Sequence, residues 1–159
     1  MIVVDITTVD LENAEKLYSF ECLNNSVMEG KSNIYGAIGE VALEKYLKSK
    51  NRVVDFKSTF DYDMIVSGKK IDVKTKRTTV VPKDDYLCSV AAFNTKQKCD
   101  YYVFARVSEK KDVAYILGYI SKGDFYSRST FYKKGDIDVN GFVFKTDNYS
   151  IKVKDLNKF

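Results

Sequence analysis

The segment from residue 61 to residue 77 has the sequence pattern of a β-hairpin, and it constrains the fold more than any other part of the chain. Two runs, 62–66 and 70–75, are rich in apolar and β-branched residues. Between them stands Ser67-Gly68, which is a two-residue turn signal. A two-residue loop fixes which residues pair across the hairpin, so the pattern also assigns each side chain to a face.

The two faces of this predicted hairpin differ in character. One face is apolar and is expected to belong to the core; it carries Tyr62, Met64, Val66, Ile71 and Val73. The other face carries Asp61, Asp63, Asp72 and Lys74, with Asp63 opposite Asp72 and Asp61 opposite Lys74.

Two opposed carboxylates repel each other unless a positive charge lies beside them. Directly opposed residues have Cβ atoms about 5 Å apart. At that separation two carboxylates repel by roughly 3 kcal/mol at an effective dielectric near 20. Lys74 offsets part of this, and a divalent cation would offset more, because hard cations bind carboxylate oxygens. We therefore interpret Asp63, Asp72 and Lys74 as half of a metal site; a solvated charged face is the alternative.

The composition limits the chemistry that such a site could use. The 159 residues predict one domain, spanning 1–159. The absence of histidine excludes histidine general bases, Ser-His-Asp triads and zinc sites built on histidine. Three cysteines without C-x-x-C spacing indicate neither a zinc site nor a disulfide framework. Any metal would be held mainly by oxygen, which favours Mg²⁺ or Mn²⁺.

Charge and hydropathy suggest where the protein acts. The formal net charge of +4 is compatible with a polyanionic partner. No signal peptide or apolar run of membrane-spanning length is present, so we expect a cytoplasmic protein without a membrane partner. The Lys-, Asn- and Ile-rich composition suits an AT-rich bacterial or phage genome.

A helix predicted at 34–49 precedes the hairpin. Gly36 and Gly39 lie on one face of it, although a mid-helix glycine costs about 1 kcal/mol relative to alanine. The pair therefore predicts a close approach to another backbone. Glu40 follows directly, and the helical pattern alone favours an ordinary surface position for it. Further strands are expected at 2–6, 53–56, 86–92, 101–107, 113–120 and 149–153, with helices at 10–23, capped by Thr8, and after Ser121.

The order of these motifs resembles the PD-(D/E)XK nuclease superfamily. The matching residues are Gly36-Ala37-Ile38-Gly39-Glu40, then Asp63, then Asp72-Val73-Lys74. The resemblance implies a restriction endonuclease-like α/β fold, in which helices flank a central mixed β-sheet and the core order is α-β-β-β-α-β. It also implies metal-dependent hydrolysis of phosphodiester bonds.

The resemblance also implies roles for individual residues. Asp63, Asp72 and the Val73 carbonyl would bind the metal, and Lys74 would assist the attacking water. Glu40 would hold a second metal or a metal-bound water.

The chain departs from the family pattern in two places. Tyr62 stands where a proline commonly precedes the first acid, so Asp61 competes with Asp63 for that role. Asp72 stands where many members have glutamate. Gln97 and Tyr101 match the spacing of a motif in one branch of the superfamily, but they fall at a loop–strand junction and not on a helix. We therefore assign them no role.

These features lead to the hypothesis of a Mg²⁺- or Mn²⁺-dependent nuclease, with an endonuclease acting on DNA favoured. Cleavage of both strands of a symmetric duplex would call for a homodimer. The alternative is a nuclease-like fold that binds nucleic acid or protein with little or no catalysis. Basic residues near the acids are expected to contact phosphates, or else to protect a hairpin edge; they are Lys69, Lys76, Arg77, Lys96 and Lys98.

Overall fold

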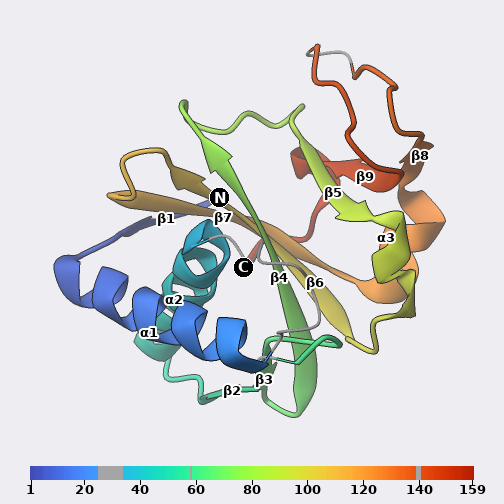
Figure 1. Cartoon of the computed structure of the whole chain (residues 1–159). Coiled ribbons are helices and arrows are strands. Elements are labelled where there is room, and N and C mark those ends of the chain that lie inside the picture. Colours follow the sequence, from blue (N-terminus) through green and yellow to red (C-terminus); the bar gives the residue numbers. More distant parts are fainter. Residues whose placement is uncertain (25–33, 58, 139–140) are drawn as a thin grey trace.

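A six-stranded mixed sheet forms the centre of the computed structural model, which describes residues 1–24, 34–57, 59–138 and 141–159, with the backbone alone for 20–24. Its strands, in spatial order, are β1 (Ile2–Asp5), β7 (Val113–Ser121), β6 (Tyr101–Ser108), β4 (Lys69–Thr78), β3 (Met64–Val66) and β2 (Val54–Phe56) (Figure 1). β4 and β6 are parallel, and the other neighbouring pairs are antiparallel.

A second, three-stranded antiparallel sheet and the helices complete the described fold. The small sheet has the order β5 (Leu87–Ala91), β9 (Asn148–Lys152) and β8 (Thr130–Tyr132). The helices are α1 (Thr8–Asn24), α2 (Ile34–Ser49) and α3 (Lys122–Arg128), with 3₁₀ turns η1 (Ala92–Lys96) and η2 (Val153–Asp155). The predicted α/β class is confirmed. Within the described residues, no helix combines the length and apolar character needed to span a membrane.

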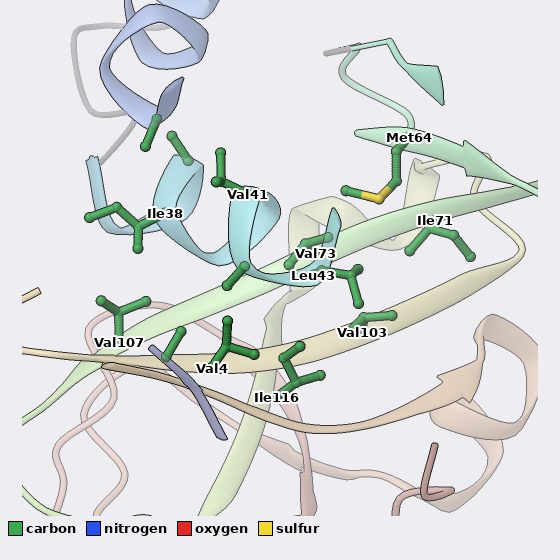
Figure 2. Close-up of a cluster of buried hydrophobic side chains, with 14 residues drawn as sticks. Val4, Ile38, Val41, Leu43, Met64, Ile71, Val73, Val103, Val107 and Ile116 are labelled. Carbon is green, nitrogen blue, oxygen red and sulfur yellow. The ribbon is translucent and has the colours of Figure 1, made fainter. Parts of the chain in front are cut away.

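Two apolar clusters lie on opposite faces of the large sheet. The first lies between α2 and the sheet, where Ile38 and Leu43 gather with Val73, Val103 and Ile116 (Figure 2). The second lies on the other face, where β5, β9 and α3 cover it (Figure 1); it includes Tyr102, Phe104, Phe125, Val90 and Ile151. Adjacent residues of β4 therefore point into different surroundings.

The predicted hairpin and its turn are confirmed. Met64, Ile65 and Val66 pair with Ile71, Lys70 and Lys69, as a two-residue loop requires. Ser67 and Gly68 both have positive φ, 49° and 76°, which is the conformation of a type I′ turn. This conformation suits the twist of the two strands.

The register departs from the prediction at Asp63. Its amide donates to the Ile71 carbonyl at 2.9 Å, although Ile71 already pairs with Met64. Two consecutive residues thus lie against one residue of β4, as in a β-bulge. Tyr62 consequently packs with the second cluster, so its predicted place on the face of Met64 is wrong. The direct opposition of Asp63 to Asp72 is replaced by a contact of the Asp63 carboxylate with the Val73 amide.

The segment between β4 and β6 also differs from the expected core order. The resemblance implies a helix at this place, but the chain forms β5 and η1. Pro82 stands early in this segment and disfavours a helix interior. The backbone groups of residues 87–91 are satisfied by pairing with β9, which explains a strand in place of a helix.

The helix boundaries follow local capping. α1 is capped by Thr7 and not by the predicted Thr8, because the Asp10 amide donates to Thr7 Oγ1 at 3.3 Å and the Asp10 carboxylate accepts from the Thr7 amide at 2.8 Å. The predicted cap of α3 is confirmed, since Ser121 Oγ accepts from the Asp124 amide at 3.1 Å.

The two glycines of α2 have different surroundings. A Cβ added to Gly39 would overlap the Thr75 hydroxyl and lie 3.0 Å from Thr75 Cβ. This close approach of helix to strand was predicted. A Cβ on Gly36 would meet no atom within 4 Å, so the prediction for Gly36 is wrong.

Replacing Gly39 by alanine should therefore destabilise the fold. We expect Gly39→Ala to lower the free energy of unfolding by about 1–3 kcal/mol through overpacking. Gly36→Ala is the matched control and should raise it by up to about 1 kcal/mol, because alanine is the better helix former. Urea unfolding of both variants measures the difference. Equal effects of the two substitutions would contradict the close packing of α2 on β4.

Candidate active site

Asp72 and Lys74 form a buried ion pair on β4. The side chain of Asp72 lies on the face away from α2, because its β6 partner Tyr102 belongs to the second cluster. Asp72 is only 2% exposed, and its Oδ2 lies 2.6 Å from Lys74 Nζ. The Lys74 side chain keeps 21% of its surface exposed. One end of this pair is therefore enclosed, and the other reaches solvent.

Gln97 holds the second oxygen of the Asp72 carboxylate. Its Nε2 donates to Asp72 Oδ1 at 2.8 Å and to the Phe60 carbonyl at 2.7 Å. Both partners are acceptors at this point, so the amide must present its nitrogen to them. Gln97 is 5% exposed, and Lys122 Nζ donates to its backbone carbonyl. The residue thus joins the start of the hairpin, the loop before β6 and the carboxylate of β4.

Burial raises the pKa of the Asp72 carboxyl above its ordinary value. Desolvation outweighs the opposing effects of the Lys74 ammonium and the Gln97 amide. Strongly perturbed carboxyls beside a specific charge partner are concentrated at functional sites in proteins. Asp72 is therefore a candidate for a functional residue, because burial raises the pKa of its carboxyl group.

Asp63 lies directly against the peptide bond that joins Asp72 to Val73. Its Oδ2 accepts from the Val73 amide at 2.6 Å, in the place where a ladder carbonyl would normally accept. Asp63 is half-buried, whereas Val73 is buried in the first cluster. The Asp63 carboxylate is thus bonded to the backbone of the residue that follows Asp72.

Asp61 hydrogen-bonds to the loop before β6 and not, among the described residues, to the backbone of β4. Its Oδ1 accepts from the Lys98 amide at 3.0 Å, which ties the start of the hairpin to the loop before β6. Asp63 contacts the Asp72–Val73 peptide, and Asp61 does not share that bond. The placement therefore favours Asp63 over Asp61 as the acid next to Asp72.

Glu40 is buried at 5% exposure, in contrast to the surface position that the helical pattern favoured. It belongs to α2, which packs on the face of the sheet opposite to the Asp72 side chain. Glu40 thus approaches β4 from the side of Val73 and Thr75. The sequence order alone carries no information about this division of faces.

The carboxylate oxygens of these residues are suitable ligands for a hard divalent cation, but those of Asp72 are already occupied by protein partners. Within the described parts of the chain, no three Asp, Glu, His or Cys side chains gather in a way that could hold a metal ion. Both oxygens of Asp72 already have protein partners, Lys74 and Gln97. A cation at Asp72 would therefore have to take the place of one of them.

The basic residues predicted to contact phosphates fall into two groups. Lys69, Lys96 and Lys98 are exposed, at the hairpin turn and around the loop before β6. Arg77 is exposed but pairs with Glu109 at 2.9 Å, and Lys76 is recessed, with its Nζ donating to Ser89 Oγ at 3.0 Å.

The chain contains a second Asp-x-Lys sequence, at Asp55 and Lys57, whose ion pair is exposed where that of Asp72 and Lys74 is buried. Asp55 and Lys57 form an ion pair of 2.8 Å at β2, with side chains 56% and 41% exposed. Exposed pairs of this kind contribute little to stability. The spacing is the same as in Asp72-Val73-Lys74, so only the fold distinguishes the two.

Comparison with known proteins gives no match, either to a protein-family model or to a curated protein. The resemblance to the PD-(D/E)XK superfamily therefore rests on the sequence motifs alone.

Removing the Gln97 side chain should weaken the fold through Asp72. We expect Gln97→Ala to lower the free energy of unfolding by about 1–3 kcal/mol, because a buried carboxylate loses a hydrogen-bond donor. Lys98→Ala is the control, since its side chain is exposed and only its backbone amide is used. Denaturant unfolding measures both.

The coupling can be isolated in an Asp72→Ala background. There the loss caused by Gln97→Ala should be smaller by about 1 kcal/mol, because residues in direct contact are not additive. The same loss in both backgrounds would contradict a role for Gln97 in holding Asp72.

Proposed function

We propose that this chain is a divalent-cation-dependent nuclease acting on phosphodiester bonds in DNA, with endonucleolytic cleavage. The observation that carries the proposal is the buried Asp72–Lys74 pair, 2.6 Å apart, with the Asp63 carboxylate bonded to the adjacent Val73 amide. A buried acid–lysine pair and a second acid on the adjacent backbone thus support this proposal, and burial raises the pKa of the Asp72 carboxyl.

The strand order supports the restriction endonuclease-like core that belongs to this proposal. α2 precedes three consecutive antiparallel strands, β2, β3 and β4, and β6 then lies parallel to β4. This is the implied helix, three strands and final strand, except that β5 and η1 make the crossover in place of a helix. Asp63 directly precedes the second strand of the meander and Asp72 lies on the third, in the order that the resemblance implies.

The residues divide the proposed work among them. Asp63, Asp72 and the Val73 carbonyl would hold Mg²⁺ or Mn²⁺, which when bound polarises a phosphoryl group and lowers the pKa of water. Lys74, with its side chain partly exposed, would lie beside the attacking water. Gln97 would orient Asp72 from behind. The role of Glu40 stays a prediction, since α2 lies on the opposite face.

The remaining parts of the proposal concern surroundings and partners. The exposed Lys69, Lys96 and Lys98 would contact phosphates without reading sequence. Cys88 and Cys99 are buried free thiols, which is compatible with the reducing cytoplasm. Cleavage of both strands of a duplex would need two copies of the chain.

A second candidate function is a nuclease-like fold that binds nucleic acid without cleaving it. The observation that favours it is the closure of Asp72, whose two oxygens are held by Lys74 and Gln97. A carboxylate whose charge and hydrogen bonds are satisfied by Lys74 and Gln97 could serve only to stabilise the sheet. The two functions differ in whether Asp72 matters for cleavage or only for stability.

Cleavage assays on substituted proteins test the proposal. Supercoiled, linear and single-stranded DNA are incubated with Mg²⁺ or Mn²⁺ and the wild-type chain. Asp72→Asn and Lys74→Met should each lower the cleavage rate by about 100-fold or more, as loss of an electrostatic partner at an active site commonly does. Asp55→Asn and Lys57→Met carry the matched changes in the exposed pair and should cleave like the wild type.

Thermal unfolding of the same variants separates activity from folding. A folded Asp72→Asn variant that cleaves at the wild-type rate would overturn the assigned site. Absence of cleavage by the wild-type chain, together with DNA binding in EDTA, would establish the binding module in its place.

A further inference from the structure

A polar pocket lies on the same face of β4 as Asp72 and Lys74, toward the other end of the strand. Its volume is about 230 Å³, and it is lined by residues of β4, β5 and β6 and by Asp138, Phe142 and Phe144. The residues that give it its character are Lys76, Arg106, Ser89, Tyr86, Phe142 and Asp138.

Two cations stand side by side at the base of this pocket. Lys76 on β4 is the register partner of Arg106 on β6, so their Cα atoms lie about 4.8 Å apart on neighbouring strands. Both residues are half-buried. Within the described residues, neither forms a salt bridge with a carboxylate, and Asp138 is the acid in the pocket lining.

The two cations are instead held by neutral groups. Lys76 Nζ donates to Ser89 Oγ at 3.0 Å, and Ser89 Oγ in turn accepts from Ser150 Oγ at 2.8 Å. Arg106 Nη2 donates to the Leu87 carbonyl at 3.3 Å, which uses one of the five guanidinium N–H groups. The ammonium and the guanidinium are thus fixed by neutral groups, and the charge of Asp138 in the lining offsets only part of theirs.

The repulsion and burial of the two cations outweigh the attraction of Asp138, which acts on both of them. Burial, together with the charge of Arg106, lowers the pKa of Lys76 to about 8. Burial likewise lowers the pKa of Arg106. Like charges taken partly out of water repel each other strongly, and an anion between them would offset this repulsion.

Aromatic rings surround the cations and suggest what carries the anion. The Lys76 ammonium lies 5.3 Å from the centre of the Phe142 ring, and the Arg106 guanidinium lies 4.9 Å from that of Tyr86. Phe142 keeps 49% of its surface exposed. Exposed aromatic rings beside basic groups are the platform on which nucleotide bases stack.

We propose that this pocket binds the phosphate group of a nucleotide, with Lys76 and Arg106 as its ligands and Phe142 or Tyr86 against the base. A doubly charged phosphate matches two adjacent cations, and arginine binds phosphate oxygens through paired N–H donors. The carrier is a terminal nucleotide of a nucleic-acid strand or a free mononucleotide.

The pocket and the candidate active site lie along the same face of β4. Lys76 lies four residues from Asp72, which corresponds to about 13 Å along a strand. The two sites could therefore contact different nucleotides of one strand. The proposal depends on the proposed function only for the nature of the ligand, because phosphate binding in this pocket requires neither a divalent metal ion nor cleavage.

Binding measurements in EDTA test the pocket without any catalysis. Isothermal titration of the full chain compares inorganic phosphate, a nucleoside 5′-monophosphate and the unphosphorylated nucleoside. Fluorescence anisotropy compares single-stranded DNA with and without a 5′-phosphate. We expect the monophosphate to bind at least tenfold more tightly than the nucleoside.

Substitutions then assign the binding to the pocket. Lys76→Met and Arg106→Met should each weaken phosphate-dependent binding at least tenfold. Lys57→Met, at an exposed lysine outside both proposed sites, should leave it unchanged. Methionine retains the apolar stem in each pocket variant, and unfolding curves verify that the fold persists.

Each outcome decides the proposal. A preference for 5′-phosphorylated DNA that Lys76→Met abolishes supports a strand terminus as the ligand. Binding of the mononucleotide alone, lost in the same variant, supports a free nucleotide. Absence of phosphate-dependent binding, or binding that Lys76→Met and Arg106→Met leave intact, overturns it. Retention of this binding in Asp72→Asn, with cleavage lost, separates the pocket from the nuclease site.

Discussion

The ion pair between Asp72 and Lys74 connects the candidate site to the rest of the fold. A carboxylate that is 2% exposed needs compensation for its lost hydration. Lys74 and Gln97 provide this from the same strand and from the loop before β6. Because Gln97 also holds the Phe60 carbonyl and is itself held by Lys122, this one carboxylate organises segments distant in the sequence.

Successive side chains of β4 point to opposite faces of the sheet, and the two faces have different surroundings. Val73 and Thr75 face α2, where apolar packing and the close approach of Gly39 stabilise the sheet. Asp72 and Lys74 point to the other face, where the small sheet covers aromatic residues. Apolar packing stabilises both faces of the sheet, and the proposed chemistry and phosphate binding lie on the face of the second cluster.

Much of this arrangement could be predicted from local patterns. The hairpin followed from its turn residues, and the approach of α2 followed from Gly39. The bulge at Asp63 could not, because it depends on a carboxylate replacing a ladder acceptor. Gln97 and Arg106 were missed since their partners, Asp72 and Lys76, are brought to them by the parallel pairing of β4 and β6 and by the crossover. Long-range contacts of this kind leave no periodic signal.

We propose that the Asp72 carboxylate binds a divalent cation. Titration with Mn²⁺, followed by electron paramagnetic resonance of the free ion, measures this directly. The account predicts Mn²⁺ binding that Asp72→Asn abolishes and that Asp55→Asn, in the exposed pair, leaves intact. Equal Mn²⁺ binding by the wild-type chain and a folded Asp72→Asn variant would contradict it.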